Sequence, residues 1–280
     1  MQSGRYIEAC HARCKERCRQ TEVTARQADY RYNRWMKTSR SSKAKPPRRV
    51  LVIDVGGSHV KFRIGRSGEI NRFDSGLEMT AEQMVEGVTK VVSPSQYDVV
   101  SIGYPGLVFH NHITADPHNL GGGWVHFDFE KALGKPVRVI NDAAMQAMGS
   151  YEGGRMLFLG LGTGLGATLI VEGVIEPMEI GHMPYRNGRT YEDYVGERGR
   201  LRLGTKKWRK VVREVVDQLS KILEVDYVVV GGGNAKRLKS LLENERLGDN
   251  DNAFDGGLRL WESSGHPLQM DPKHRRRVSK

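Results

Sequence analysis

A chain of 280 residues is long enough for two domains of ordinary size, each with its own hydrophobic core. Residues 1–49 carry a net charge of +10 and residues 271–280 one of +4, so the total of +11 leaves −3 for the residues between them. This mildly acidic body argues against a nucleic-acid-binding core, and without a run of about 18 apolar residues we expect no membrane span.

The basic head, residues 1–49, has few aliphatic residues and a linker-like stretch at residues 39–47. We expect it to be disordered or loosely helical, and it lacks the apolar segment of a secretory signal. The cysteines of the chain all lie in this head, at Cys10, Cys14 and Cys18. Together with His11 they leave a metal site open, although their spacing differs from the paired cysteines of structural zinc. A body without cysteine fits a reducing compartment, so we expect a cytoplasmic protein.

The first predicted elements of the body form a hairpin. Residues 50–53 are an apolar run before glycines, which predicts a buried strand, and the alternating residues 60–64 predict a second strand. Gly56, Gly57 and Ser58 then lie in the turn. Glycine there permits positive φ and leaves the backbone N–H groups uncovered, and such a concave set of amides binds phosphate.

The middle of the chain alternates between helices and strands. Thr80 and Gln83 predict a capping box that opens a helix over residues 80–92. The further predicted elements are a strand at 98–103 that ends in a turn, short elements at 112–115 and 127–133, a strand at 137–140 and a helix at 143–148.

The hairpin pattern occurs again at residues 156–175, with a glycine turn at 160–166. Two copies about a hundred residues apart predict a duplicated fold with one phosphate-binding turn in each half, and two ordinary glycine-rich hairpins are the alternative. Gly162, Gly164 and Ala167 also fit the dinucleotide-binding fingerprint by letter. That fingerprint opens a helix, whereas the β-branched residues 167–171 predict a strand.

The last third of the body predicts a long helix at 206–223, a buried strand at 227–230 and a helix at 234–242. Three glycines, residues 231–233, follow the strand. Strands that alternate with helices and end in glycines predict an α/β architecture with its site at the carboxyl ends of the strands.

Seven motifs occur in the order found in the ROK family of sugar kinases, which the chain resembles over about residues 48–262. They are Asp54-x-Gly56-Gly57-Ser58-x-x-Lys61, Gly103-x-Pro105-Gly106, Asn119-Leu120 with Trp124, Asn141-Asp142-Ala143, Leu161-Gly162-Thr163-Gly164-x-Gly166, Glu179-x-Gly181-His182 and Gly231-Gly232-Gly233. Residues 190–210 and 253–261 resemble the polyphosphate glucokinase branch in particular. The resemblance implies an actin-like, ribonuclease-H-like duplicated fold with a cleft between lobes at 50–141 and 142–262, followed by a basic tail, residues 263–280.

The resemblance assigns Asp142 the role of general base, which takes the proton of the sugar hydroxyl as it attacks phosphorus. A plain helix N-cap is the alternative for this aspartate. The resemblance also implies a set of groups that contact the sugar: Pro105, Gly106, Asn119, Asn141, Glu179, His182 and Glu192. The sequence around Glu192 diverges from the family, and a lone histidine is often structural.

Phosphoryl transfer depends on positioning and charge neutralisation, which backbone amides supply in part. The expected phosphate-binding residues are Asp54, Gly56, Gly57, Ser58, Lys61, Gly162, Thr163, Gly164, Gly232 and Gly233. Asp54 is expected to orient Mg²⁺ through water. Many family members carry a cysteine-rich zinc motif, but the chain has no cysteine after Cys18, so we expect no zinc site in the body.

The identity of the phosphoryl donor stays open between polyphosphate and ATP. Residues 186–213 contain ten Lys and Arg against three Asp and Glu. We expect a basic track for polyphosphate at Lys206, Lys207, Lys210 and Arg213, with a solvated helix face as the alternative. The glycines at 231–233 contact adenosine in ATP-using relatives.

We therefore expect a hexose kinase that transfers a phosphoryl group to the 6-hydroxyl of glucose or a related hexose. A ROK-type sugar-binding regulator without kinase activity is the alternative, but residues 1–49 lack the apolar spacing of a helix-turn-helix. Nucleic-acid tethering by the basic ends would be nonspecific and would collapse with salt. The resemblance also implies a homodimer.

Overall fold

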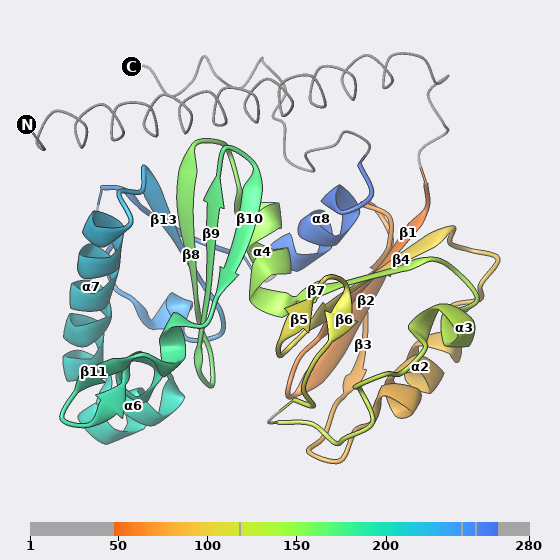
Figure 1. Ribbon diagram of the computed structural model, residues 1–280, viewed down its shortest axis with the longest axis horizontal. Coiled ribbons are helices and arrows are strands. Elements are labelled where there is room, and N and C mark those ends of the chain that lie inside the picture. Colours follow the sequence, from red (N-terminus) through yellow and green to blue (C-terminus); the bar gives the residue numbers. More distant parts are fainter. Residues whose placement is uncertain (1–47, 118, 242, 250, 263–280) are drawn as a thin grey trace, which may run out of the picture. The chain divides into compact units, whose positions relative to one another are not determined.

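The computed structural model describes residues 48–117, 119–241, 243–249 and 251–262, and these form two mixed β-sheets with helices around them (Figure 1). The first sheet has the spatial order β3 (Asn71–Asp74), β2 (His59–Ile64), β1 (Val50–Val55), β4 (Val99–Tyr104) and β7 (Val137–Asn141). The second has the order β10 (Val174–Met178), β9 (Leu165–Val171), β8 (Arg155–Leu161), β13 (Tyr227–Gly231) and β14 (Glu245–Leu247).

The two sheets share one topology. In each, the first strand in the sequence, β1 or β8, pairs antiparallel with the strand after it and parallel with a later one. The antiparallel pairs β1–β2 and β8–β9 are the two predicted glycine hairpins. The duplicated α/β fold predicted from the sequence is therefore confirmed.

The remaining elements are helices and two short hairpins. The helices are α2 (Ala81–Thr89), α3 (Phe129–Leu133), α4 (Asp142–Ser150), α5 (Tyr191–Val195), α6 (Glu197–Leu203), α7 (Thr205–Ile222) and α8 (Asn252–Arg259), with short 3-10 turns at Ile180–His182 and Ala235–Arg237. The hairpins are β5 (Val108–Phe109) with β6 (His112–Ile113), and β11 (Pro184–Arg186) with β12 (Arg189–Thr190). No helix among the described residues is long and apolar enough to cross a membrane.

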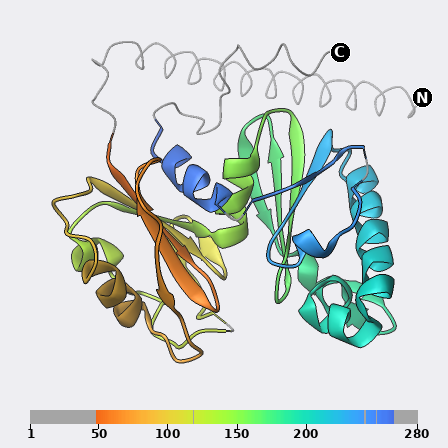
Figure 2. The ribbon, with the colours of Figure 1, turned by 180° about the vertical axis from the view of Figure 1, so that it is seen from behind.

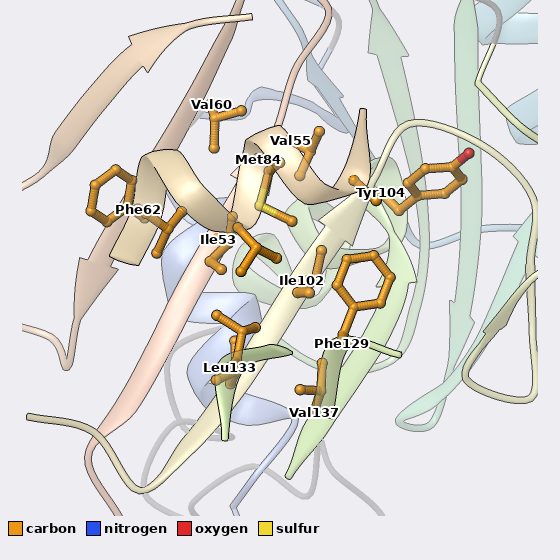
Figure 3. Packing of buried hydrophobic residues seen from close by; sticks show 14 of the residues in the cluster. Ile53, Val55, Val60, Phe62, Met84, Ile102, Tyr104, Phe129, Leu133 and Val137 are labelled. Carbon is orange, nitrogen blue, oxygen red and sulfur yellow. The ribbon is translucent and has the colours of Figure 1, made fainter. Parts of the chain in front are cut away.

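One hydrophobic core covers the first sheet. Ile53 and Ile102 are fully buried and pack in one cluster with Met84 of α2 (Figure 3). The predicted capping box is present, because Thr80 accepts from the Gln83 N–H and the Gln83 side chain accepts from the Thr80 N–H. Each fully buried aliphatic side chain contributes about 1.5–3 kcal/mol.

Helix α7 lies beside the second sheet (Figure 2), and a second core joins the two. Trp208 and Val212 of α7 pack in one cluster with Leu157 and Val228. The indole N–H of Trp208 donates to the carbonyl of Val195, so this buried polar group is satisfied.

Helices α4 and α8 pack against each other, and α8 also contacts β1 and β4 of the first sheet. The backbones come close because the contact residues are glycines. A Cβ at Gly149 of α4 would lie 1.8 Å from the Asn252 carbonyl oxygen, and one at Gly256 of α8 would lie 1.8 Å from that of Met145. Ser101 of β4 donates to the carbonyl of Gly257 and fixes α8 on the sheet.

The predicted helix over residues 234–242 is wrong. Only Ala235–Arg237 form a 3-10 turn, and Leu238 is extended. Side chains of α7 take the backbone carbonyls that a helix would need: Arg209 donates to the carbonyl of Arg237, and Arg213 to Ser240. Position 242 lies outside the described residues, as do the basic tail, the possible metal site and almost all of the basic head. The lobe boundaries stay a prediction.

Candidate active site

The strand register brings the chemical groups of the first sheet to one edge. Asp54, at the end of β1, lies opposite Gly103 of β4, and Tyr104 lies opposite Asn141 of β7. Because β1, β4 and β7 are parallel, their carboxyl ends meet, and Asp142 follows directly as the first residue of α4.

Missing side chains on both sheets make room for the start of α4. A Cβ at Gly103 would lie 2.3 Å from the Met145 Cε and 3.6 Å from the Asp142 Cα. A Cβ at Gly166 of β9 would lie 2.8 Å from the Ala143 Cβ. The amino end of α4, with Asp142, therefore lies where the two sheets approach each other.

Asn141 holds that helix end in place. Its side-chain oxygen accepts from the Ala144 N–H, and its NH₂ group donates to the carbonyl of Gly106. These bonds tie the predicted sugar-contact turn, Pro105-Gly106, to α4. Asn141 keeps one amide proton and one lone pair for a ligand.

The carboxylates at this edge influence one another. Burial first, and then the charges of Asp54 and Glu179, raise the pKa of Asp142 to about 7, although the hydrogen bond from the Ala143 N–H works against them. Burial likewise raises the pKa of Asp54 to about 6, with Lys61 lowering it and Asp251 raising it. A carboxyl group with a pKa near neutrality can exchange a proton with a substrate hydroxyl at physiological pH.

The first turn, residues 56–58, joins β1 to β2, and one residue outside it hydrogen-bonds two of its backbone carbonyls. Ser75 donates its hydroxyl to the Gly56 carbonyl and its N–H to that of Ser58. The N–H groups of Gly57 and Ser58 have no acceptor within the described part of the chain. A Cβ at Gly57 would lie 2.9 Å from Asn119 Nδ2, so Asn119, a predicted sugar contact, borders this turn.

The second turn, residues 162–164, joins β8 to β9 and is built in the same way. The backbone N–H of Glu197 donates to the carbonyls of Gly162 and Thr163, and the side chain of Asn234 donates to that of Gly162. Among the described residues, nothing accepts from the N–H groups of Thr163 and Gly164. Both turns thus present free amides, which is the requirement of an anion site.

The predicted sugar contacts of the second sheet lie beside the second turn. Glu179 precedes the 3-10 turn Ile180–His182 and His182 ends it, with Glu179 Oε2 and His182 Nε2 3.5 Å apart. A Cβ at Gly181 would lie 3.5 Å from the Glu192 Cβ. Glu192 Oε2 accepts from the Leu165 N–H, so this carboxylate also lies under the second turn.

The other residues predicted to bind the phosphoryl donor lie directly after β13 and on α7. Gly232 follows β13 with φ of 81°, and a Cβ there would lie 2.6 Å from the Leu161 carbonyl oxygen, so only glycine fits beside the second turn. On α7, Lys206, Lys207 and Lys210 are exposed, whereas Arg213 is bonded to Ser240. Within the predicted basic track, the three lysines are therefore more available to a phosphate chain than Arg213 is.

Three residues that hold the turns were not predicted from the sequence: Ser75, Glu197 and Asn234. The only sequence signal is that Asn234 directly follows the glycines at 231–233. Among the described residues, no three His, Cys, Asp or Glu side chains are grouped to hold a metal ion.

Two sheets of one topology, each with a glycine hairpin between its first two strands, define an actin-like two-lobe fold. Solved structures with this fold include the inorganic polyphosphate/ATP-glucomannokinase of Arthrobacter sp. strain KM, which is 25% identical at a TM-score of 0.63 over 75% of this chain and 97% of that one. The ROK family glucokinase of Streptomyces griseus, in complex with glucose and AMPPNP, is 17% identical at a TM-score of 0.57, over 76% of this chain and 98% of that one.

The ROK hexokinase of Thermus thermophilus is 18% identical at a TM-score of 0.56, over 75% of this chain and 96% of that one. No curated protein sequence matches the chain. Residues 50–193, just over half of the chain, match the ROK family. The protein belongs to the ROK family and has the fold of that family's sugar kinases.

Proposed function

We propose that this ROK-family protein is a hexose kinase that transfers a terminal phosphoryl group from polyphosphate or ATP to the 6-hydroxyl of glucose or a related hexose. The observation that carries the proposal is the position of Asp142. This carboxyl group, with a pKa near 7, starts the helix that both sheets contact, and each of those sheets contains a hairpin turn with free amides.

In the proposed step the sugar oxygen forms a bond to the terminal phosphorus, and the bond from that phosphorus to the bridging oxygen of the donor breaks. Asp142 takes the hydroxyl proton, and the shortened donor leaves with the electron pair. The amides of Gly57 and Thr163 neutralise phosphate charge on either side.

The residues present fit Mg²⁺ held through water. Asp54 is a half-buried carboxylate opposite Lys61, and the described residues hold no close group of His, Cys, Asp or Glu side chains that would enclose a bare cation. Mg²⁺ usually keeps several waters and takes one or two carboxylates together with phosphate oxygens. When bound, it would supply charge neutralisation at the donor phosphates.

On the sugar side, Glu179 and His182 would hydrogen-bond hydroxyls remote from the reacting one. Asn119 borders the first turn, Asn141 bonds the carbonyl of Gly106, and Glu192 lies under the second turn. Such contacts orient the acceptor oxygen toward phosphorus.

A coupled assay of product formation from glucose and mannose, with ATP and with polyphosphate as donors, tests the proposed function. Turnover with at least one pair is expected. Sugar binding without turnover for any pair would instead favour the ROK-type regulator.

The acid pair predicts how activity depends on pH. Asp142 must be deprotonated to act as base, so kcat/KM for the sugar should fall about ten-fold per unit below pH 7 and more steeply below pH 6, where Asp54 also gains a proton. Because the charge of Asp54 raises the pKa of Asp142, Asp54→Asn should move the midpoint of that fall to lower pH. A flat profile between pH 5 and 8 would count against this assignment.

Polyphosphate use should depend on the exposed lysines of α7. Replacing Lys206 and Lys210 together by alanine should raise KM for polyphosphate by about 5- to 10-fold at low salt, since each exposed charge contact contributes up to about 1 kcal/mol. KM for ATP should change less, because a shorter donor reaches fewer lysines. The matched control is Lys221→Ala, because Lys221 is an exposed lysine near the other end of α7 that pairs with Asp217. Equal effects on both donors would contradict the track.

A further inference from the structure

We propose that Asn234 is a positioning residue that aims the amides of the second turn at the phosphoryl donor. The proposal rests on the proposed function, because it assigns the second turn, residues 162–164, to the donor. Asn234 is buried, directly follows the glycines after β13, and reaches the turn across 72 residues of sequence.

The side chain of Asn234 is held by three partners. Its Nδ2 donates to the Gly162 carbonyl oxygen at 3.2 Å and to Glu197 Oε2 at 2.9 Å, and its Oδ1 accepts from Arg237 Nε at 2.9 Å. A carbonyl and a carboxylate can only accept, and a guanidinium can only donate, so the orientation of the amide group is fixed.

Glu197 keeps its charge in this network. Hydrogen bonds from Arg200 first, and then from Asn234, lower the pKa of Glu197 to about 2. The backbone N–H of Glu197 meanwhile donates to the carbonyls of Gly162 and Thr163 at 3.1 and 3.2 Å. The main chain of one residue and the side chain of the other thus hold the same face of the turn.

Holding these carbonyls fixes the direction of the free amides. A trans peptide unit is planar, so its N–H points opposite to its C=O. With the Gly162 carbonyl turned toward Asn234 and Glu197, the N–H of Thr163 must point to the other side, and the Thr163 carbonyl does the same for the N–H of Gly164. Within the described part of the chain these two N–H groups have no acceptor.

The first turn contains the same arrangement from unrelated residues. Ser75 holds the carbonyl of Gly56 with its hydroxyl, which directs the N–H of Gly57 away from it. Two lobes that fix the carbonyls of their glycine turns by different side chains indicate that the direction of the amides matters in both.

The test compares Asn234→Ala and the isosteric Asn234→Asp with the wild-type protein. Calorimetry measures the affinity for tripolyphosphate with Mg²⁺ and, separately, for glucose, and an assay measures kcat and the donor KM. Loss of one hydrogen bond should weaken tripolyphosphate binding about 3- to 10-fold in the alanine variant. The aspartate, facing Glu197 and an acceptor carbonyl, should weaken it further. Glucose affinity should stay unchanged.

Asn244→Ala and Asn244→Asp are the matched controls, because Asn244 is exposed on the same lobe and its side chain, within the described residues, bonds only Ser220. They should behave as wild type. Variants of Asn234 with wild-type affinity for tripolyphosphate would overturn the proposal, and so would an equal loss of glucose affinity, which would indicate general loosening. If the wild-type protein binds tripolyphosphate but transfers a phosphoryl group neither from a polyphosphate nor from ATP, the kinase proposal fails while the binding comparison still decides the role of Asn234.

Discussion

Replacing Asp142 by asparagine is expected to lower kcat by about 10²- to 10⁴-fold, while the affinity for the sugar changes little. Asparagine keeps the shape of the side chain and its bond to the Ala143 N–H, but it cannot take a proton. The loss should therefore appear in the chemical step. Single-turnover kinetics with glucose, together with calorimetric binding of glucose, separate the two quantities.

Unfolding cannot explain that loss, because the variant should be at least as stable as the wild-type protein at pH 8. The pKa of Asp142 is raised from 3.8 to about 7 by folding, so the folded state binds this proton more tightly than the unfolded state. The resulting stabilisation is complete below about pH 4 and is lost as the pH rises to about 7. An amide avoids burying the charge above that pH.

Asp217→Asn is the matched control, since Asp217 lies on α7 and, among the residues that the structure describes, pairs only with Lys221. It should leave kcat within two-fold of the wild-type value, given that such surface pairs contribute little. Full activity of the Asp142 variant would rule out this residue as the base, whatever the control does.

The second large effect is expected for stability. Gly256→Ala should lower the free energy of unfolding by about 3 kcal/mol or more, the upper range for overpacking. The new Cβ would lie 1.8 Å from the Met145 carbonyl oxygen and 3.1 Å from the Gly149 nitrogen, and backbone atoms of a helix cannot move aside as a flexible side chain can. Urea denaturation measures the change.

Gly76→Ala is the control, because a Cβ there meets nothing within 4 Å and the residue has no positive φ. It should be neutral or slightly stabilising. Since α4 carries Asp142 at its start, separation of α4 from α8 should also lower kcat of the Gly256 variant while it is still folded. Wild-type stability of this variant would contradict the close packing of the two helices.

The repeated hairpins and the long helix could be predicted from the sequence because their signals are local. Apolar runs bounded by glycines gave β1 and β8, the capping box at Thr80 gave the start of α2, and the apolar stripe of residues 206–223 gave α7. In these elements the period of the apolar residues agrees with the face that the fold buries.

Other elements depend on distant contacts. Helix α8 contains Gly256 and Gly257, which lower helix propensity, and it forms because those glycines let it approach α4 and β1. The residues after Asn234 have a helical pattern, but arginines of α7 take their carbonyls. Neither outcome has a signal within the segment itself.

In the candidate site too, some residues could be predicted from local sequence patterns and others could not. Asp54 and Asp142 follow strands, so a pattern of strand ends could suggest them, and their roles stay predictions. Ser75 and Asn234 act on backbone carbonyls 19 and 72 residues away, and a single side chain that bonds a main-chain atom leaves no spacing to recognise. The direction of the free N–H groups follows from those hydrogen bonds, and no sequence pattern indicates it.

A crystal structure with glucose and a donor analogue, tripolyphosphate or AMPPNP, tests the central claim most directly through one distance. We expect the 6-hydroxyl oxygen within about 3.2 Å of an Asp142 carboxylate oxygen, with the terminal phosphate accepting from the N–H groups of Thr163 and Gly164. A sugar with every hydroxyl beyond hydrogen-bond reach of Asp142, or donor phosphates away from both turns, would contradict the account.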